Sequence, residues 1–346
     1  MQYTILLFVL IFLHVLDYSK ADRRTLLIGS IILLSSFAVV YSQTGSIDYD
    51  GYKSYFDCIG IPDCSSELSV EYGFKLIVNV FQVIFGDNFW LFISSYSVLA
   101  IIIKLYFLKK YSPYFMLSVF FYFCYNFLMH DMTQVRVGIS LAFFWLAIDK
   151  YCERLPWKSF GFFLLAVLMH TSALVGGIIY LLSRESFSKR FYYLLIPVSY
   201  IISFSVNREY LLSLPSIFFP DSRLSIYSAG FENEIWAFNP ISPTIIIFLV
   251  ANILLMIKIQ MKESSAIEII SCKLGFFAVA AFSLTYWVPA LGIRAFEYLN
   301  SLYPLVFVFA IKKYNNKYIY ALFFLFGLFY WENNLINHEI MLDFFI

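Results

Sequence analysis

The chain has 346 residues, a formal net charge of +1, 61% hydrophobic residues and only 14% charged ones. Its mean hydropathy is +0.77, and uncharged stretches of about 15–20 residues recur, a length typical of bilayer-spanning helices. This composition predicts an all-α integral membrane protein, and the near-zero net charge offers no attraction to nucleic acid. We expect a single polytopic domain over 1–346, because no segment is long and polar enough for a separate soluble domain.

The positions of the spans follow from the apolar runs and from the distribution of positive charge. A total of about 10–12 transmembrane helices is expected. With the spans given below, all but six of the 24 Lys and Arg residues lie on the cytoplasmic side, as the positive-inside rule predicts. Lys104 is assigned to a cytoplasmic connector. Both termini and the loops 43–89 and 207–242 are then outside. The predicted spans are about 3–18, 25–42, 90–108, 112–130, 134–150, 191–206, 243–260, 273–291, 296–311 and 317–331. The six outer cations are Lys53, Lys75, Arg136, Arg208, Arg223 and Arg294.

Two apolar stretches do not fit this charge pattern as full spans. Counting 72–85 as a span would move Lys109 and Lys110 to the outer face, so we expect a short helix at the outer surface there. A single crossing by 159–183 would likewise leave basic connectors on both faces. We therefore expect a re-entrant or broken helix near His170, since such breaks are tolerated where protein or water covers them. The alternative is an ordinary span at 159–183 with a local exception to the charge rule.

The five cysteines offer little chemistry. Cys58 and Cys64 lie in the first outer loop, where an oxidising compartment favours a local disulfide between them. The other three lie in or beside predicted spans and are typical of small apolar filling residues. No Cys or His cluster has the spacing of metal ligands, so we expect neither a metal site nor a cofactor.

Ionisable groups gather at the expected outer boundary of the membrane, where burial is costly and a partner or polar cavity is usual. Arginine there suits an anionic ligand, because its guanidinium binds phosphate oxygens in a bidentate fork. A carboxylate or imidazole nearby would activate a hydroxyl group. The candidate catalytic residues are His170 and one of two loop carboxylates, Asp48 or Asp50. The candidate substrate-binding residues are Tyr52, Glu71, Gln134, Arg136, Arg294, Glu297 and Tyr298.

Each charged candidate also has a structural interpretation, and the sequence leaves both open. Arg136 would snorkel to the outer interface. Arg294 would pair with Glu297, three residues further along the same helix. Glu71 would interact with the start of the helix 72–85.

Asp48 and His170 have structural alternatives of their own. Asp48, like Asp50 beside it, would be a solvated loop carboxylate, and physical reasoning alone does not separate the two. His170 would be a hydrogen-bonded break within an apolar stretch.

Several short patterns follow one another between about residue 40 and residue 300. They are Asp-x-x-x-Tyr-x-x-x-Phe (Asp48, Tyr52, Phe56), Glu-x-Gly-Phe (Glu71, Gly73, Phe74), Arg-x-Gly (Arg136, Gly138), His-x-Ser-Ala (His170, Ser172, Ala173) and a late Arg followed by Tyr (Arg294, Tyr298). Taken in this order, the patterns resemble the EpsG/Wzy-like family of bacterial polysaccharide polymerases. The family more often has Arg-Gln-Gly where this chain has Arg136, Val137 and Gly138.

The resemblance implies polymerisation of undecaprenyl-diphosphate-linked oligosaccharide repeat units into O-antigen or a related surface polysaccharide. The reaction would take place on the outer face of the bacterial cytoplasmic membrane, with lipid-linked glycans as donor and acceptor. A membrane protein that regulates chain length is a further partner that the resemblance allows. The family spacing favours Asp48 over Asp50.

Two other functions compete with polymerisation. One is an O-antigen-type ligase, which usually carries a larger outer domain than the loop 207–242. The other is a flippase or transporter of lipid-linked sugars without chemistry, which should expose cations along a path through both leaflets. Since the unusual charges gather at one boundary, polymerisation is the favoured function.

Overall fold

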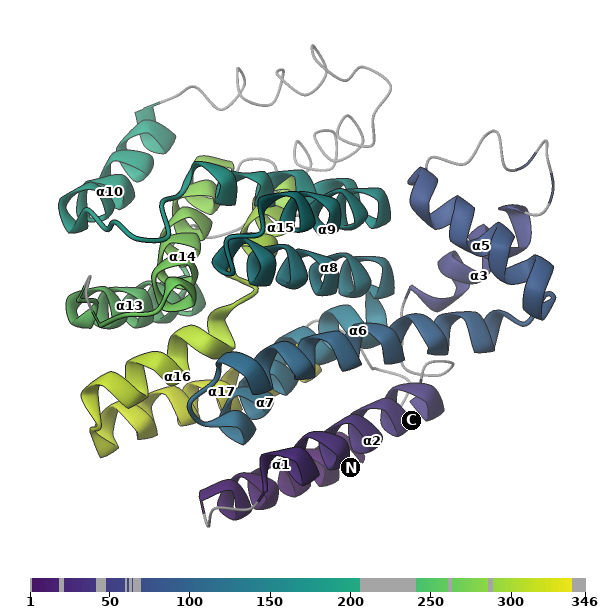
Figure 1. Ribbon diagram of the computed structural model, residues 1–346, viewed down its shortest axis with the longest axis horizontal. Coiled ribbons are helices and arrows are strands. Elements are labelled where there is room, and N and C mark those ends of the chain that lie inside the picture. The colour runs from purple at the N-terminus through teal and green to yellow at the C-terminus, as the bar shows by residue number, and fades with distance from the viewer. Residues whose placement is uncertain are drawn as a thin grey trace. The chain divides into compact units, whose positions relative to one another are not determined.

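The computed structural model describes residues 2–18, 22–41, 48–59, 61, 64, 70–205, 241–260, 263–285 and 289–337. Every regular element in these ranges is a helix, which confirms the all-α class (Figure 1). In hydrocarbon a helix satisfies its backbone hydrogen bonds within one segment, so an apolar chain of this kind is expected to be helical. The predicted loop 207–242 lies almost entirely outside the described residues. The helices are α1 (Gln2–Tyr18), α2 (Arg23–Tyr41), α3 (Tyr49–Ile59), α5 (Tyr72–Phe85), α6 (Phe89–Tyr111), α7 (Phe115–Tyr122), the π-helix η1 (Phe123–Thr133), α8 (Val135–Cys152), α9 (Pro156–Met169), the 3₁₀ helix η2 (Thr171–Leu181), α10 (Lys189–Ser205), α13 (Pro243–Lys258), α14 (Ala266–Thr285), α15 (Pro289–Asn300), α16 (Tyr303–Tyr314) and α17 (Lys317–Asn337).

Three of the described helices are long and apolar enough to cross a membrane, namely Arg23–Val40 of α2, Phe89–Tyr111 and Ala266–Thr285. A fourth candidate is the pair formed by α7–η1 and α8, which is bent by 120°. Shorter apolar helices, among them α5, α9 and α13, accompany them. The chain is therefore a membrane protein with several spans, and the total of 10–12 stays a prediction.

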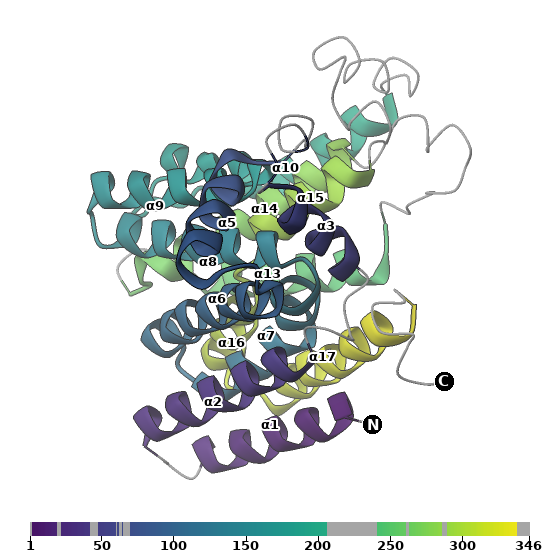
Figure 2. The same ribbon diagram turned by 90° about the vertical axis from the view of Figure 1, so that its right-hand side faces the viewer.

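The contacts of the chain divide it into two compact units, residues 1–174 with 315–346 and residues 175–314. The expected single domain over 1–346 stays a prediction. In the first unit, α8 packs along α9, and α6 packs against α2 and α8 (Figure 1). Helices α1 and α2 lie side by side in both views (Figure 2). In the second unit, α14 packs against α10, α13, α15 and α16.

Local sequence signals account for several helix ends in the first unit. Gly86 ends α5 with a positive φ of 71°, a conformation that costs glycine least. Asn88 then begins α6, because its side chain accepts the backbone N–H of Leu91 at 3.0 Å, as N-cap residues do. Between α8 and α9, Arg154 has a φ of 62°, and Pro156 occupies the first turn of α9, where its missing N–H costs nothing.

Three details of the predicted layout can be compared with these helices. The expected short helix at 72–85 is confirmed as α5, and the expected break near 170 is confirmed where α9 ends at Met169. The expected break before a span at 296–311 is wrong. Arg294 and Glu297 lie within α15, and the chain turns after that helix instead.

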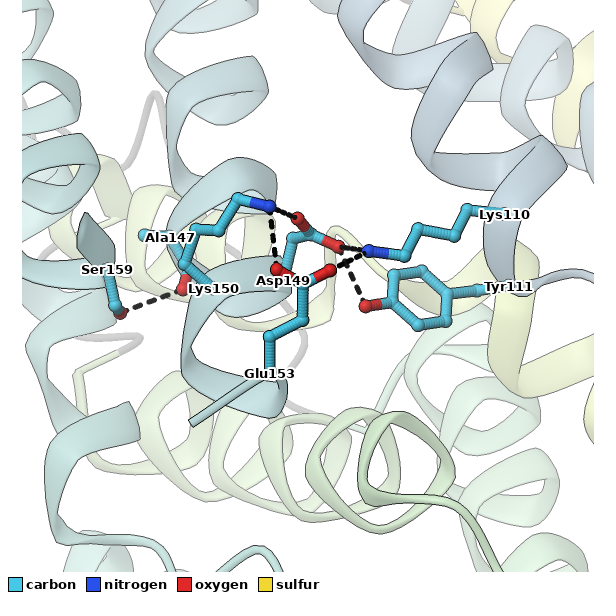
Figure 3. A network of polar contacts seen from close by, with 7 residues as sticks. All are labelled: Lys110, Tyr111, Ala147, Asp149, Lys150, Glu153 and Ser159. Carbon is cyan, nitrogen blue, oxygen red and sulfur yellow. Dashed lines mark hydrogen bonds and ion pairs between the residues drawn. The ribbon is translucent and has the colours of Figure 1, made fainter. Parts of the chain in front are cut away.

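An ion-pair network ties the end of α6 to the end of α8 (Figure 3). Lys110 Nζ lies 2.6 Å from Asp149 Oδ1 and also contacts Glu153, while Lys150 Nζ lies 2.7 Å from Glu153 Oε2. Tyr111 donates its hydroxyl to Asp149 at 2.7 Å. Hydrogen bonds from Lys110 and Lys150 lower the pKa of Glu153. Two of the basic residues assigned to the cytoplasmic side are therefore largely neutralised by neighbouring carboxylates.

Candidate functional site

Glu71 and Arg136 form the centre of the strongest candidate site. Glu71 immediately precedes α5 and adopts an extended backbone, yet its side chain makes no capping hydrogen bond to that helix. Instead its Oε2 atom accepts a hydrogen bond from Arg136 Nη1 at 2.6 Å. Arg136 lies in the first turn of α8 and is only 9% exposed. The geometry therefore favours an ion pair between Glu71 and Arg136 over the two alternatives that the sequence left open, capping of α5 by the Glu71 side chain and snorkelling of Arg136.

Three aromatic rings surround the guanidinium of Arg136. Its Cζ atom lies 5.4 Å from the ring centre of Tyr52, 5.5 Å from that of Tyr55 and 5.3 Å from that of Phe74. Rings at this distance attract a cation through their quadrupoles, more strongly where water is excluded. The sequence predicted Tyr52 alone. A spacing of four residues separates Asp48, Tyr52 and Phe56, as on one face of a helix. This spacing is the feature of the sequence that indicates α3 within the predicted loop 43–89.

A third chain segment reaches Glu71 at the break after α9. His170 has extended backbone angles, φ −156° and ψ 122°, and its Nδ1 atom lies 3.9 Å from Glu71 Oε1. The next backbone N–H, that of Thr171, points to the same carboxylate oxygen at 3.4 Å. Ser172 donates its backbone N–H to His170 Nδ1 at 3.2 Å. The carboxylate of Glu71 therefore links α8, the start of α5 and the broken segment.

Two glycines allow close packing around this site, Gly73 between α5 and the end of α9, and Gly138 between α8 and η1. A Cβ atom on Gly73 would collide with the backbone carbonyl oxygen of Leu168 and would lie 2.6 Å from Met169 Cε. A Cβ atom on Gly138 would lie 2.6 Å from the carbonyl oxygen of His130. Both distances are far below van der Waals contact, so these positions require glycine. Glu71 lies two positions before Gly73, and Arg136 lies two positions before Gly138. Each glycine therefore allows close packing of the segment that carries the charged residue.

An apolar cluster lies beneath the aromatic rings and joins α3, α5, α6 and α8. It includes Phe56, Phe74 and Phe92, all fully buried, with Tyr96 and Met169 beside them. Tyr96 donates its hydroxyl to the sulfur of Met169 at 3.6 Å. Dry, close-packed surroundings strengthen the charge interactions above them, because the local dielectric constant is low.

The other predicted site residues lie around this centre or in the second unit. Asp48 precedes α3, and its carbonyl oxygen accepts the N–H of Tyr52 at 2.9 Å. Gln134 occupies the bend between η1 and α8. In the second unit, Arg294 Nη1 pairs with Glu297 Oε2 at 2.9 Å, the helix-face pair that the sequence had left open, and Tyr298 is fully buried.

Cys58, near the end of α3, forms a disulfide with Cys64, and the two Cα atoms are 5.4 Å apart. This bond closes a short loop on the segment that supplies Tyr52 and Tyr55.

Within the ranges that the structure describes, no group of three or more His, Cys, Asp or Glu side chains has an arrangement suited to a metal ion.

A second buried charge cluster lies behind the start of α8. Lys104 Nζ and Asp131 Oδ1 are 2.6 Å apart, and both side chains are 0% exposed. Tyr122 donates its hydroxyl to the other carboxylate oxygen. The assignment of Lys104 to a cytoplasmic connector is therefore wrong, because the residue lies within α6 and its charge is compensated by Asp131. A Cβ atom on Gly138 would lie 2.8 Å from this carboxylate, so the cluster packs directly against α8.

Comparison with known protein families matches residues 24–345 to the EpsG family. The chain belongs to the EpsG family. The match spans both units and includes every predicted site residue, and it supports a general role in polysaccharide polymerisation for this multi-pass membrane protein. No curated protein and no solved structure shows a significant match.

Proposed function

We propose that the protein polymerises undecaprenyl-diphosphate-linked oligosaccharide repeat units on the outer face of the bacterial cytoplasmic membrane. The observation that carries this proposal is the nearly buried Arg136, held by three aromatic rings beside Glu71 and His170. A cation preorganised in dry surroundings is suited to a leaving group that gains negative charge, which is where electrostatic catalysis contributes most.

In the proposed reaction a hydroxyl of the acceptor glycan attacks the anomeric carbon of the donor. The new C–O bond forms while the bond to the diphosphate breaks, and the electron pair leaves with the diphosphate, which Arg136 binds. His170 takes the proton of the hydroxyl, and Asp48 is the alternative base. Tyr55 is partly exposed and presents a ring on which a sugar can stack. Tyr52 is buried beside Arg136 and would act on the substrate through that guanidinium.

The remaining predicted residues are assigned supporting roles. Gln134, at the bend that precedes Arg136, is proposed to contact substrate. Arg294, with Glu297 and Tyr298, is proposed to contact substrate as well. A membrane protein that regulates chain length is a proposed partner.

The proposed function is tested by reconstituting the purified protein in liposomes with a lipid-linked repeat unit. The expected product is a ladder of lipid-linked polymers, and Arg136→Ala should form none.

Glycan analysis of a deletion strain separates polymerisation from the alternative functions of ligase and flippase. Single capped repeats without a ladder are expected for a polymerase, whereas loss of all capped glycan would indicate a ligase or a flippase.

A further inference from the structure

The contacts of Glu71 raise a question that the proposed function leaves open. The carboxylate occupies Arg136 Nη1 at 2.6 Å, which is the atom that a diphosphate would need. Arg136 Nε is buried and has no hydrogen-bond acceptor within the described part of the chain. The donor Nη1 is thus already occupied by a carboxylate, and the buried Nε is closed to a ligand in this arrangement.

We propose that Glu71 is a displaceable counter-ion that moves from Arg136 to His170 when the diphosphate of the lipid-linked donor binds. This proposal rests on the proposed function. In the structure the carboxylate balances a nearly buried charge, whose desolvation would otherwise be costly. A diphosphate carries more than one negative charge and offers several oxygen acceptors, so it replaces a single carboxylate at the guanidinium.

The movement required of Glu71 is small. Its Oε1 atom already faces the N–H of Thr171 at 3.4 Å and His170 Nδ1 at 3.9 Å. A shift of about 1 Å brings Glu71 Oε1 and His170 Nδ1 within hydrogen-bond distance of each other. The terminal torsion of a glutamate has a broad energy profile, so one oxygen can leave Arg136 while the other stays near the broken segment.

The exchange also changes which nitrogen of His170 can accept a proton. In the present arrangement Nδ1 accepts the N–H of Ser172 at 3.2 Å, so a neutral ring carries its proton on Nε2 and that atom is not a base. A carboxylate against Nδ1 requires a proton there, which leaves the lone pair on Nε2 available. Nε2 then takes the proton of the acceptor hydroxyl as the glycosidic bond forms, and the resulting imidazolium is stabilised by Glu71, as in other carboxylate–histidine pairs.

Glu71 is therefore a positioning residue that acts through His170, and binding of the donor assembles the base. The consequence is an unusual kinetic signature. Removing the charge of Glu71 relieves competition for Arg136 while it removes the orientation of His170. Affinity for the diphosphate should be kept or improved, whereas turnover should fall.

The test compares Glu71→Gln, His170→Gln and the double variant, all full-length in nanodiscs, with Glu153→Gln in the separate network of Figure 3 as the matched control. Binding of undecaprenyl diphosphate is measured by calorimetry, and turnover is measured with a lipid-linked repeat unit. Glu71→Gln should bind at least as tightly as wild type, with an equal or lower KM and a kcat reduced about 100-fold. The double variant should be no slower than His170→Gln alone, because residues that act as a unit are not additive.

Weaker diphosphate binding in Glu71→Gln, or multiplicative losses in the double variant, would overturn the exchange. If Glu71→Gln does not accumulate, Glu71→Asp keeps the charge on a shorter side chain and should keep wild-type affinity while losing turnover. If the wild type binds undecaprenyl diphosphate but forms no polymer, the proposed function fails. The binding comparison still decides whether Glu71 competes for Arg136.

Discussion

Glu71 and Arg136 are 65 positions apart in the chain, yet a hydrogen bond of 2.6 Å joins their side chains at the meeting point of α5 and α8. The pair is enclosed by rings from α3 and α5, and the segment broken at His170 completes it. Both side chains are only slightly exposed, 11% and 12%, and a nearly buried ion pair is stable only when its geometry is well satisfied. A position of this kind in a membrane protein is a candidate for function.

Arg136→Lys should lose most polymerising activity although it keeps the positive charge. An ammonium group cannot provide the planar fork with which the guanidinium binds a diphosphate. Loss of one charge-assisted contact costs about 1.5–3 kcal/mol, which is roughly one to two decades in rate. The measurement is ladder formation by equal amounts of purified protein. Normal ladders from the lysine variant would assign Arg136 a purely structural role.

Gly73→Ala should destabilise the protein, because the added methyl group meets the backbone carbonyl of Leu168, which no side-chain rotation can relieve. Overpacking of this kind costs about 1–3 kcal/mol. Gly161, in α9, is the matched control, since a Cβ atom there meets nothing within 4 Å. Gly161→Ala should be neutral or stabilising by up to about 1 kcal/mol. Thermal unfolding in detergent measures both, and equal effects would show that α5 and α9 do not pack this closely.

Lys104→Met should be far more damaging than Lys110→Met. The first leaves the fully buried carboxylate of Asp131 without its cation, at a cost of about 3–5 kcal/mol. The second removes a lysine whose side chain is 43% exposed, and exposed pairs contribute about 0–1 kcal/mol. Adding Asp131→Asn to Lys104→Met should restore part of the loss, because the unpaired charge is then gone. A double variant less stable than Lys104→Met would refute this account of the pair.

The sequence predicted those features that depend on local pattern and on charge distribution. The helix 72–85, the break at His170 and the i,i+3 spacing of Arg294 and Glu297 were all visible in this way. The partner of Lys104 was not, since Asp131 is 27 positions away and a single cation in an apolar run resembles a connector. Tyr55 and Phe74 were missed for a similar reason, because ordinary interfacial aromatics and rings around a cation look alike until helices α3 and α5 are packed together.

Membrane topology provides a test that is independent of the site. The distribution of Lys and Arg predicts that the segment around Tyr55 is outside and that the segment around Lys313 is cytoplasmic. Alkaline phosphatase fused after Tyr55 should be active, and the same enzyme fused after Lys313 should be inactive. Activity at Lys313 would refute this topology.

His170 distinguishes a chemical role from a structural one at the break between α9 and η2. His170→Ala should abolish polymer formation while the protein remains folded, since the ring is not part of the apolar cluster beneath Tyr52. His170→Asn and His170→Gln can replace hydrogen bonds of the ring but cannot take up a proton at neutral pH. Their turnover should therefore fall to a low residual rate, which is the reference for the double variant with Glu71→Gln. Full activity in either amide variant would mean that the histidine only satisfies the N–H of Ser172 and shapes the break.

A cysteine scan from Phe160 to Leu182 tests the geometry of the same break. Because α9 ends at Met169 and an extended residue follows, labelling by an impermeant thiol reagent from outside should be confined to positions around Met169–Ser172. The scan requires a background in which Cys124, Cys152 and Cys272 are replaced, so that only the introduced thiol reacts. Protection around His170 with labelling at one end of the stretch would indicate a continuous span and would remove His170 from the proposed site.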